Sequence, residues 1–129
     1  MRGNIGLPRL DDFCWIAAQE SNVYAGLSVV MAFVHLRPRY FGEIMGNLLC
    51  WLGPEKLCFG SDYAIGSPKW LIDKFMAYDI PDDLQQEYHA SLTLEIKRKI
   101  LGKNMARLYD IDIAAQQTKL RQDGVGLPR

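Results

Sequence analysis

Blocks of apolar residues alternate with polar breaks along the chain, and their spacing predicts helices separated by short buried strands. Residues 6–9, Gly-Leu-Pro-Arg, break any regular element, and the apolar residues from 13 to 18 then predict a short helix that Asp11 or Asp12 caps. A second helix is expected from Pro38, because apolar residues recur there at steps of three and four until Gly53 and Pro54 end the pattern.

Helices dominate the second half of the chain. Ser67 and Pro68 predict the start of one helix, with Ser67 as its cap, and apolar residues that we expect on its inner face: Trp70, Leu71, Phe75 and Met76. Pro81 marks the start of another helix, and Thr93 is expected to cap the last one. We also expect Trp15, Trp51 and Trp70 to pack in the core, since each lies within a helical apolar stripe.

Two short segments read as buried strands. Residues 23–28 are β-branched, aromatic and apolar on both faces, as expected for a strand of a parallel sheet that helices cover. Residues 56–59 form a second apolar run that stops abruptly in glycine, serine and aspartate. The order helix, strand, helix, strand, helices predicts an α/β fold with parallel strands and helical cover. Periodicity alone leaves open whether this is a slice of a barrel or a small open sheet.

Composition and charge exclude several classes of function. Fifteen basic residues balance fifteen acidic ones, so a nucleic-acid or anionic-membrane partner has no electrostatic support. The apolar stretch from 23 to 36 is shorter than a membrane span, and residues 1–6 do not resemble a signal peptide, so a cytoplasmic protein is expected. Cys14, Cys50 and Cys58 lack metal-site spacing and are expected to be buried and reduced.

Asp62 is the candidate for chemistry. It ends the run Gly60-Ser61-Asp62, directly after the second predicted strand. In α/β proteins the loops at the carboxyl ends of strands surround a shared cleft, where an aspartate can bind a metal or take a proton. The alternative is that Asp62 only caps a turn or a helix.

Three segments, in this order and spacing, resemble the amidohydrolase-related family of metal-dependent hydrolases: residues 22–28 (NVYAGLS), 59–63 (FGSDY) and 99–109 (KILGKNMARLY). The resemblance extends over residues 3–112. It implies the C-terminal part of a (β/α)₈ barrel, about its last three units, with the two strands as barrel strands seven and eight. A complete barrel needs about 250 residues and the chain has 129, so we expect a barrel portion at residues 1–112 and a disordered tail at 113–129.

The resemblance also implies a role for Asp62, as metal ligand and general base for metal-bound water in the hydrolysis of a C–N or C–O bond of a small-molecule substrate. The implied cofactor is a divalent metal, with zinc expected, held only in a complete barrel. Family members place a His-x-His motif on the first strand, which would lie before Met1, and commonly a histidine where this chain has Asn4-Ile5. Two alternatives stay open: a nonoxidative decarboxylase of the same family, and a noncatalytic remnant or interaction module.

Two further residues are weaker candidates for substrate contacts, His35 and Arg37, which follow the strand at 23–28. A packing role for His35 and a solvated charge for Arg37 are the alternatives. Asn104 and Arg107 are expected to tie the last helix to the barrel. A three-unit slice of a barrel should leave two open strand edges and an uncovered apolar face, so we expect a partner: an N-terminal half chain or a second copy.

Overall fold

Three short parallel strands lie side by side in chain order: β1 (Arg2–Asn4), β2 (Tyr24–Gly26) and β3 (Leu57–Cys58). The structure is a computed structural model that describes residues 2–64 and 66–124, with only the backbone of residues 2–4. Gly26 lies opposite Asn4 on one side and opposite Cys58 on the other. Since all three strands run the same way, their carboxyl ends meet at one edge of the sheet.

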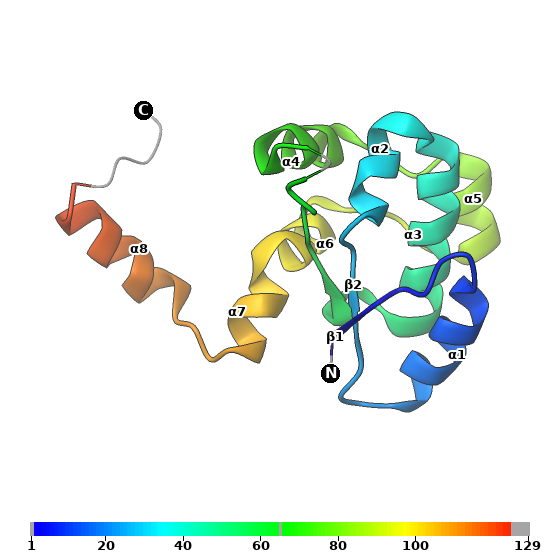
Figure 1. The fold of residues 1–129 in the computed structure, drawn as a ribbon, viewed down its shortest axis with the longest axis horizontal. Helices are drawn as coiled ribbons and strands as arrows, with labels where there is room; N and C mark the ends of the chain where they lie inside the picture. The colour runs from blue at the N-terminus through cyan, green and yellow to red at the C-terminus, as the bar shows by residue number, and fades with distance from the viewer. Residues whose placement is uncertain (1, 65, 125–129) are drawn as a thin grey trace.

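Helices connect and cover the strands (Figure 1), as parallel connections require. Helix α1 (Leu10–Gln19) follows β1, and three helical segments follow β2, namely η1 (Val30–Ala32), α2 (Phe33–Leu36) and α3 (Pro38–Leu52). The 3₁₀ turn η2 (Pro54–Lys56) precedes β3, and the helices after it are α4 (Pro68–Ala77), α5 (Asp82–Tyr88), α6 (Leu94–Arg98), the π-helical turn η3 (Lys99–Lys103), α7 (Asn104–Leu108) and α8 (Ile113–Gln122). The predicted α/β class with parallel strands is therefore confirmed.

One buried apolar cluster extends from Ile5 to Ile100 and unites the sheet with its helices. Ala25 and Leu57 are opposite one another in the register and both belong to this cluster, so this face of the sheet packs against the helices. Phe41 of α3 and Phe75 of α4 meet edge to face within it, with ring centroids 6.2 Å apart.

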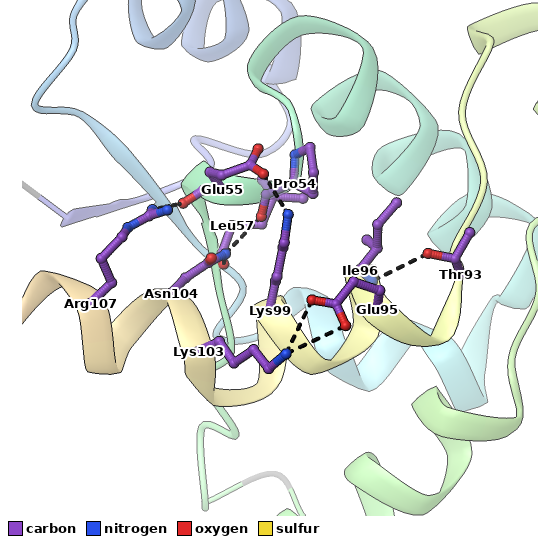
Figure 2. A network of polar contacts seen from close by, with 10 residues as sticks. All are labelled: Pro54, Glu55, Leu57, Thr93, Glu95, Ile96, Lys99, Lys103, Asn104 and Arg107. Carbon is purple, nitrogen blue, oxygen red and sulfur yellow. Dashed lines mark hydrogen bonds and ion pairs between the residues drawn. The ribbon is translucent and has the colours of Figure 1, made fainter. Parts of the chain in front are cut away.

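The outer edge of β3 is bonded to the closing helical segment. Asn104 is 2% exposed, and its Nδ2 donates to the carbonyl of Leu57 at 2.8 Å and to that of Pro54 at 2.7 Å (Figure 2). The backbone N–H of Phe59 donates to the carbonyl of Ile100 at 2.9 Å. A π turn departs from the regular i to i−4 bonding, and Ile100 lies inside η3. This edge was expected to be open, and that prediction is wrong because the chain's own helix takes its hydrogen bonds.

The same helical segment is held to the turn before β3 by longer side chains (Figure 2). Arg107 donates to the carbonyl of Glu55 at 2.7 Å, and Lys99 forms an ion pair with the Glu55 carboxylate at 2.7 Å. The expected structural role of Asn104 and Arg107 is thus confirmed. Thr93 is also confirmed as a cap, since its Oγ1 accepts the Ile96 N–H at 3.3 Å.

Several local predictions are corrected. Arg9 occupies the N-cap of α1 in place of Asp11 or Asp12, and its side chain makes no capping hydrogen bond. Ser67 is the N-cap residue of α4, but its side chain makes no capping bond. Among the cysteines, Cys14 and Cys58 are buried and outside any disulfide as expected, whereas Cys50 is exposed.

The tryptophans do not lie in the core. Trp15 is 61% exposed, Trp51 44% and Trp70 47%, and Met76 on α4 is also exposed. Trp15 and Trp51 instead pack against one another across α1 and α3, edge to face at 6.1 Å. A helical apolar stripe is wider than the strip that a neighbouring helix covers, and these large side chains fall on its margin.

Residues 113–129 were expected to be disordered, but α8 occupies 113–122 and is capped by Asp112, which accepts the Ala115 N–H at 3.0 Å. None of its residues is buried, and Figure 1 shows it projecting away from the other helices. The final five residues lie outside the described part of the chain. None of the described helices has the length and apolar content needed to cross a lipid bilayer.

Candidate functional site

The site is built from three loops that leave the sheet at one edge. The loop after β1 contains a cis peptide bond between Leu7 and Pro8. Beyond β2, the Leu27 N–H still donates to the Cys58 carbonyl at 2.9 Å, which holds the beginnings of the second and third loops together. Asp62 is in the third loop, four residues beyond Cys58.

Asp62 is half-buried and its backbone is left-handed, with φ of 45°. Aspartate tolerates this conformation better than most residues, but a non-glycine residue there is uncommon. Within residues 2–64 and 66–124, no hydrogen bond or ion pair engages its carboxylate. The turn-forming role that was the alternative for Asp62 is compatible with this backbone, yet the turn leaves both carboxylate oxygens available to a ligand.

Gly60 brings the Asp62 loop into close contact with the loop after β2. A Cβ atom at Gly60 would collide with Ser28 Oγ and would lie 3.1 Å from the Ser28 backbone nitrogen. Only glycine therefore permits this approach of the two chains. Ser28 and Gly60 each lie two residues beyond the paired positions Gly26 and Cys58, so the strand register itself brings them together.

Val29 is the most strained residue at this edge, with φ of 68° and ψ of −50°. A positive φ is a genuine outlier for a β-branched residue. Val29 also lines a hollow of about 190 Å³ between the first two loops. Its other lining residues are Ile5, Gly6, Leu7, Ser28 and Val30. Strain of this kind is concentrated at functional sites, where surrounding structure holds it in place.

His35 and Arg37, the weaker candidates, have partners of their own. The His35 ring stacks on Trp70, with centroids 3.5 Å apart and planes 5° from parallel, and its Nε2 lies 3.2 Å from the Trp70 carbonyl oxygen. The guanidinium of Arg37 lies over the Tyr40 ring, 4.7 Å from its centroid. The described contacts include none between either side chain and Asp62.

Arg39, beside these residues, is tied to α5. It forms an ion pair with Asp83 at 2.5 Å and another with Glu43 at 3.9 Å. The hydrogen bond from Arg39 holds the pKa of the Asp83 carboxyl below its usual range. The hollow of about 400 Å³ that Arg37, Pro38, Arg39, Tyr40 and Glu43 line is therefore an open surface between paired charges.

The described residues do not form a metal site by themselves. Among them there is no group of three or more His, Cys, Asp or Glu side chains placed to hold an ion. A catalytic zinc normally takes three protein ligands plus water. Asp62 fits the part of one ligand, and the other ligands would have to come from outside the described residues.

Ser28, Gly60 and Trp70 were not identified as parts of the site from the sequence. The sequence did contain a signal for Ser28 and Gly60, since each lies two residues beyond the end of an apolar strand. The stack of Trp70 on His35 joins residues 35 positions apart and has no local signal.

This geometry defines an α/β protein in which the loop with Asp62 lies at the carboxyl edge of a parallel sheet. A family model described as Amidohydrolase matches residues 3–111, nearly the span over which the resemblance was seen in the sequence. The chain belongs to the amidohydrolase family. No curated protein and no solved structure matched it.

Proposed function

We propose that the chain is the C-terminal part of a (β/α)₈ barrel hydrolase and supplies its last three units. Three consecutive strands lie adjacent in chain order, run parallel and are each followed by helices, as successive units of a barrel are. The chain has 129 residues, about half of the 250 or so that a complete barrel needs. Membership of the amidohydrolase family supports the same arrangement.

Asp62 is the residue through which this portion takes part in catalysis. The supporting observation is its half-buried carboxylate at the carboxyl edge, held by an unfavourable backbone and without a partner among the described residues. In the proposed role Asp62 accepts a proton from the water that attacks a C–N or C–O bond of a small-molecule substrate. A carboxylate at this edge also suits one position in a metal shell.

A divalent metal such as zinc, when bound, acts as a Lewis acid and makes water more acidic. Only one suitable ligand is present here, so the proposal assigns the remaining ligands to a partner that supplies the missing strands. An N-terminal half of the barrel, on this chain or on another, would supply them, whereas a second copy would bring only the same three strands. The strands of that N-terminal half would join the sheet beside β1, and closing the barrel would also require the helical segment whose Asn104 and Ile100 bond the outer edge of β3 to give up that edge.

Metal analysis of the chain mixed with an N-terminal half that carries the His-x-His strand tests the proposal. We expect one zinc per pair, and much less when Asp62→Asn is used. Asp110→Asn is the matched control, because Asp110 is also an aspartate with positive φ, 52°, but lies exposed after α7. Zinc retained in full by the Asp62→Asn pair, or held one-to-one by the chain alone in both wild type and Asp62→Ala, would contradict the assignment.

A further inference from the structure

Trp70 occupies a position between the Asp62 loop and the helix that follows β2. Its indole covers Gly66, where a Cβ atom would lie 3.0 Å from Trp70 Cε3 and 3.1 Å from Cζ3. The indole also stacks on the imidazole of His35 in α2. Trp70 therefore joins the end of the loop to α2 through ring contacts.

His35 fixes the tryptophan in a second way. Its Nε2 lies 3.2 Å from the Trp70 carbonyl oxygen, and since a carbonyl only accepts, the imidazole nitrogen is the donor. The ring planes are 5° from parallel, so one side chain holds both the indole face and the backbone of the same residue. These two contacts use one ring nitrogen and one ring face of His35.

Both ends of the Asp62 loop are thus attached to the unit that follows β2. At the first end Gly60 lies against Ser28, and at the second Gly66 lies under Trp70, which His35 holds. Asp62 is between these attachments and has no described side-chain contact of its own. Its orientation consequently depends on the two ends.

We propose that His35 and Trp70 are positioning residues: they fix the loop between β3 and α4 and so determine where the Asp62 carboxylate points. This inference rests on the proposed function only for the catalytic importance of Asp62. The attachment of the loop by His35 and Trp70 does not depend on it. His35 does not touch substrate in this account. The positioning role replaces the substrate-binding role that the sequence suggested for His35.

Three variants separate the two contacts. His35→Phe keeps an aromatic face on Trp70 and loses the donor, His35→Gln keeps a donor and loses the stack, and His35→Ala loses both. The control is His89→Asn, because the other histidine of the chain is exposed at the end of α5 with a left-handed backbone that asparagine tolerates.

The readout is amide hydrogen exchange at the Gly66 end of the loop, measured on the full chain. A hydrogen bond and a ring stack together shift a local opening equilibrium about tenfold. We expect exchange of the Leu71 amide, which donates to the Ser67 carbonyl at the Gly66 end of the loop, to rise about that much in His35→Ala, and less in His35→Phe and His35→Gln. The Leu71 amide should exchange at the wild-type rate in His89→Asn.

Loop exchange equal in all four variants and the wild type would overturn the proposal, as would a rise spread evenly over the core amides of α3, which marks a loss of global stability. These outcomes are independent of metal. If the loop responds but zinc binding ignores Asp62→Asn, the positioning role stands and the proposed function fails.

Discussion

The strands begin at one edge of the sheet, the amino edge, and end at the other, the carboxyl edge. These two edges differ in how their polar groups are satisfied. At the amino edge, Lys56 Nζ donates at 2.6 Å to two carbonyls at the end of α1, and Asn104 donates to the carbonyls of Pro54 and Leu57. Each of these side chains bonds two backbone groups from another part of the chain. The amino edge is therefore built to hold elements together.

The carboxyl edge has the opposite character. Val29 and Asp62 have positive φ, with values of 68° and 45°, and the Asp62 carboxylate has no described partner. Conformations of this kind cost stability and persist because the surrounding structure holds them. The difference teaches that one edge holds the sheet together while the other has strained backbone and a carboxylate without a described partner, as the proposed barrel function would require of its two faces.

The largest predicted effect is at the amino edge. Asn104→Ala removes two hydrogen bonds and leaves the carbonyls of Pro54 and Leu57 without their donor in a buried place, which should lower the free energy of unfolding by about 3 kcal/mol. Urea denaturation followed by circular dichroism measures it.

Arg107→Ala is the control for that substitution, since Arg107 is exposed and donates one bond to the same turn. It should cost no more than about 1 kcal/mol. Equal losses in the two variants would show that the buried amide has no special role at this edge.

The helices were largely predictable from the sequence because their signals are local. Pro38 and Pro68 begin α3 and α4 as expected, and Thr93 caps α6. Position on a helix is a weaker guide to burial. Trp70 was assigned to an inner face and is half exposed, because the neighbouring α2 presents a histidine ring there in place of an apolar surface.

The strands were harder to predict since two or three residues cannot show an alternating pattern. β1, with the polar sequence Arg-Gly-Asn, has no apolar signal, and η1 with α2 was hidden in an apolar run that continued from β2. Asp62 was found because a polar residue that ends an apolar strand is a local feature. Its supports, Ser28 and the His35–Trp70 stack, depend on register and packing that the order of residues does not show.

A substitution at the carboxyl edge should stabilise the protein, whereas Asn104→Ala at the amino edge should destabilise it. Val29→Gly removes a strained backbone that costs about 1–3 kcal/mol, and loses about 0.5–1 kcal/mol to the flexibility of glycine. We therefore expect the protein to gain about 1 kcal/mol in urea denaturation, because the two terms differ by about that much.

Val23→Gly is the matched control, because Val23 precedes β2 without a positive φ, and there the change should destabilise. If Val29→Gly destabilises the chain as much as Val23→Gly does, the backbone at Val29 is not strained, and the contrast between the two edges is lost.

The smallest effect concerns the Glu55–Lys99 ion pair beside Asn104. The hydrogen bond from Lys99, the largest cause, lowers the pKa of Glu55 from its ordinary value of 4.5. A carboxyl whose folded pKa is lowered stabilises the fold above pH 4.5 and loses this contribution as pH falls through the lowered pKa. Because the pair is partly exposed, Lys99→Met should cost only about 0.5 kcal/mol at neutral pH.

That difference between wild type and Lys99→Met should shrink to nothing in acid, once Glu55 is protonated in both. Lys103→Met is the positive control for the pH dependence, because the hydrogen bond from Lys103 also lowers the pKa of Glu95, while that pair lies within one helical segment and does not reach the turn before β3. Unfolding curves measured from neutral pH into acid distinguish the cases. A Lys99→Met difference that stays constant with pH would mean that Lys99 acts through packing, and that Asn104 and Arg107 alone provide the polar attachment of this edge.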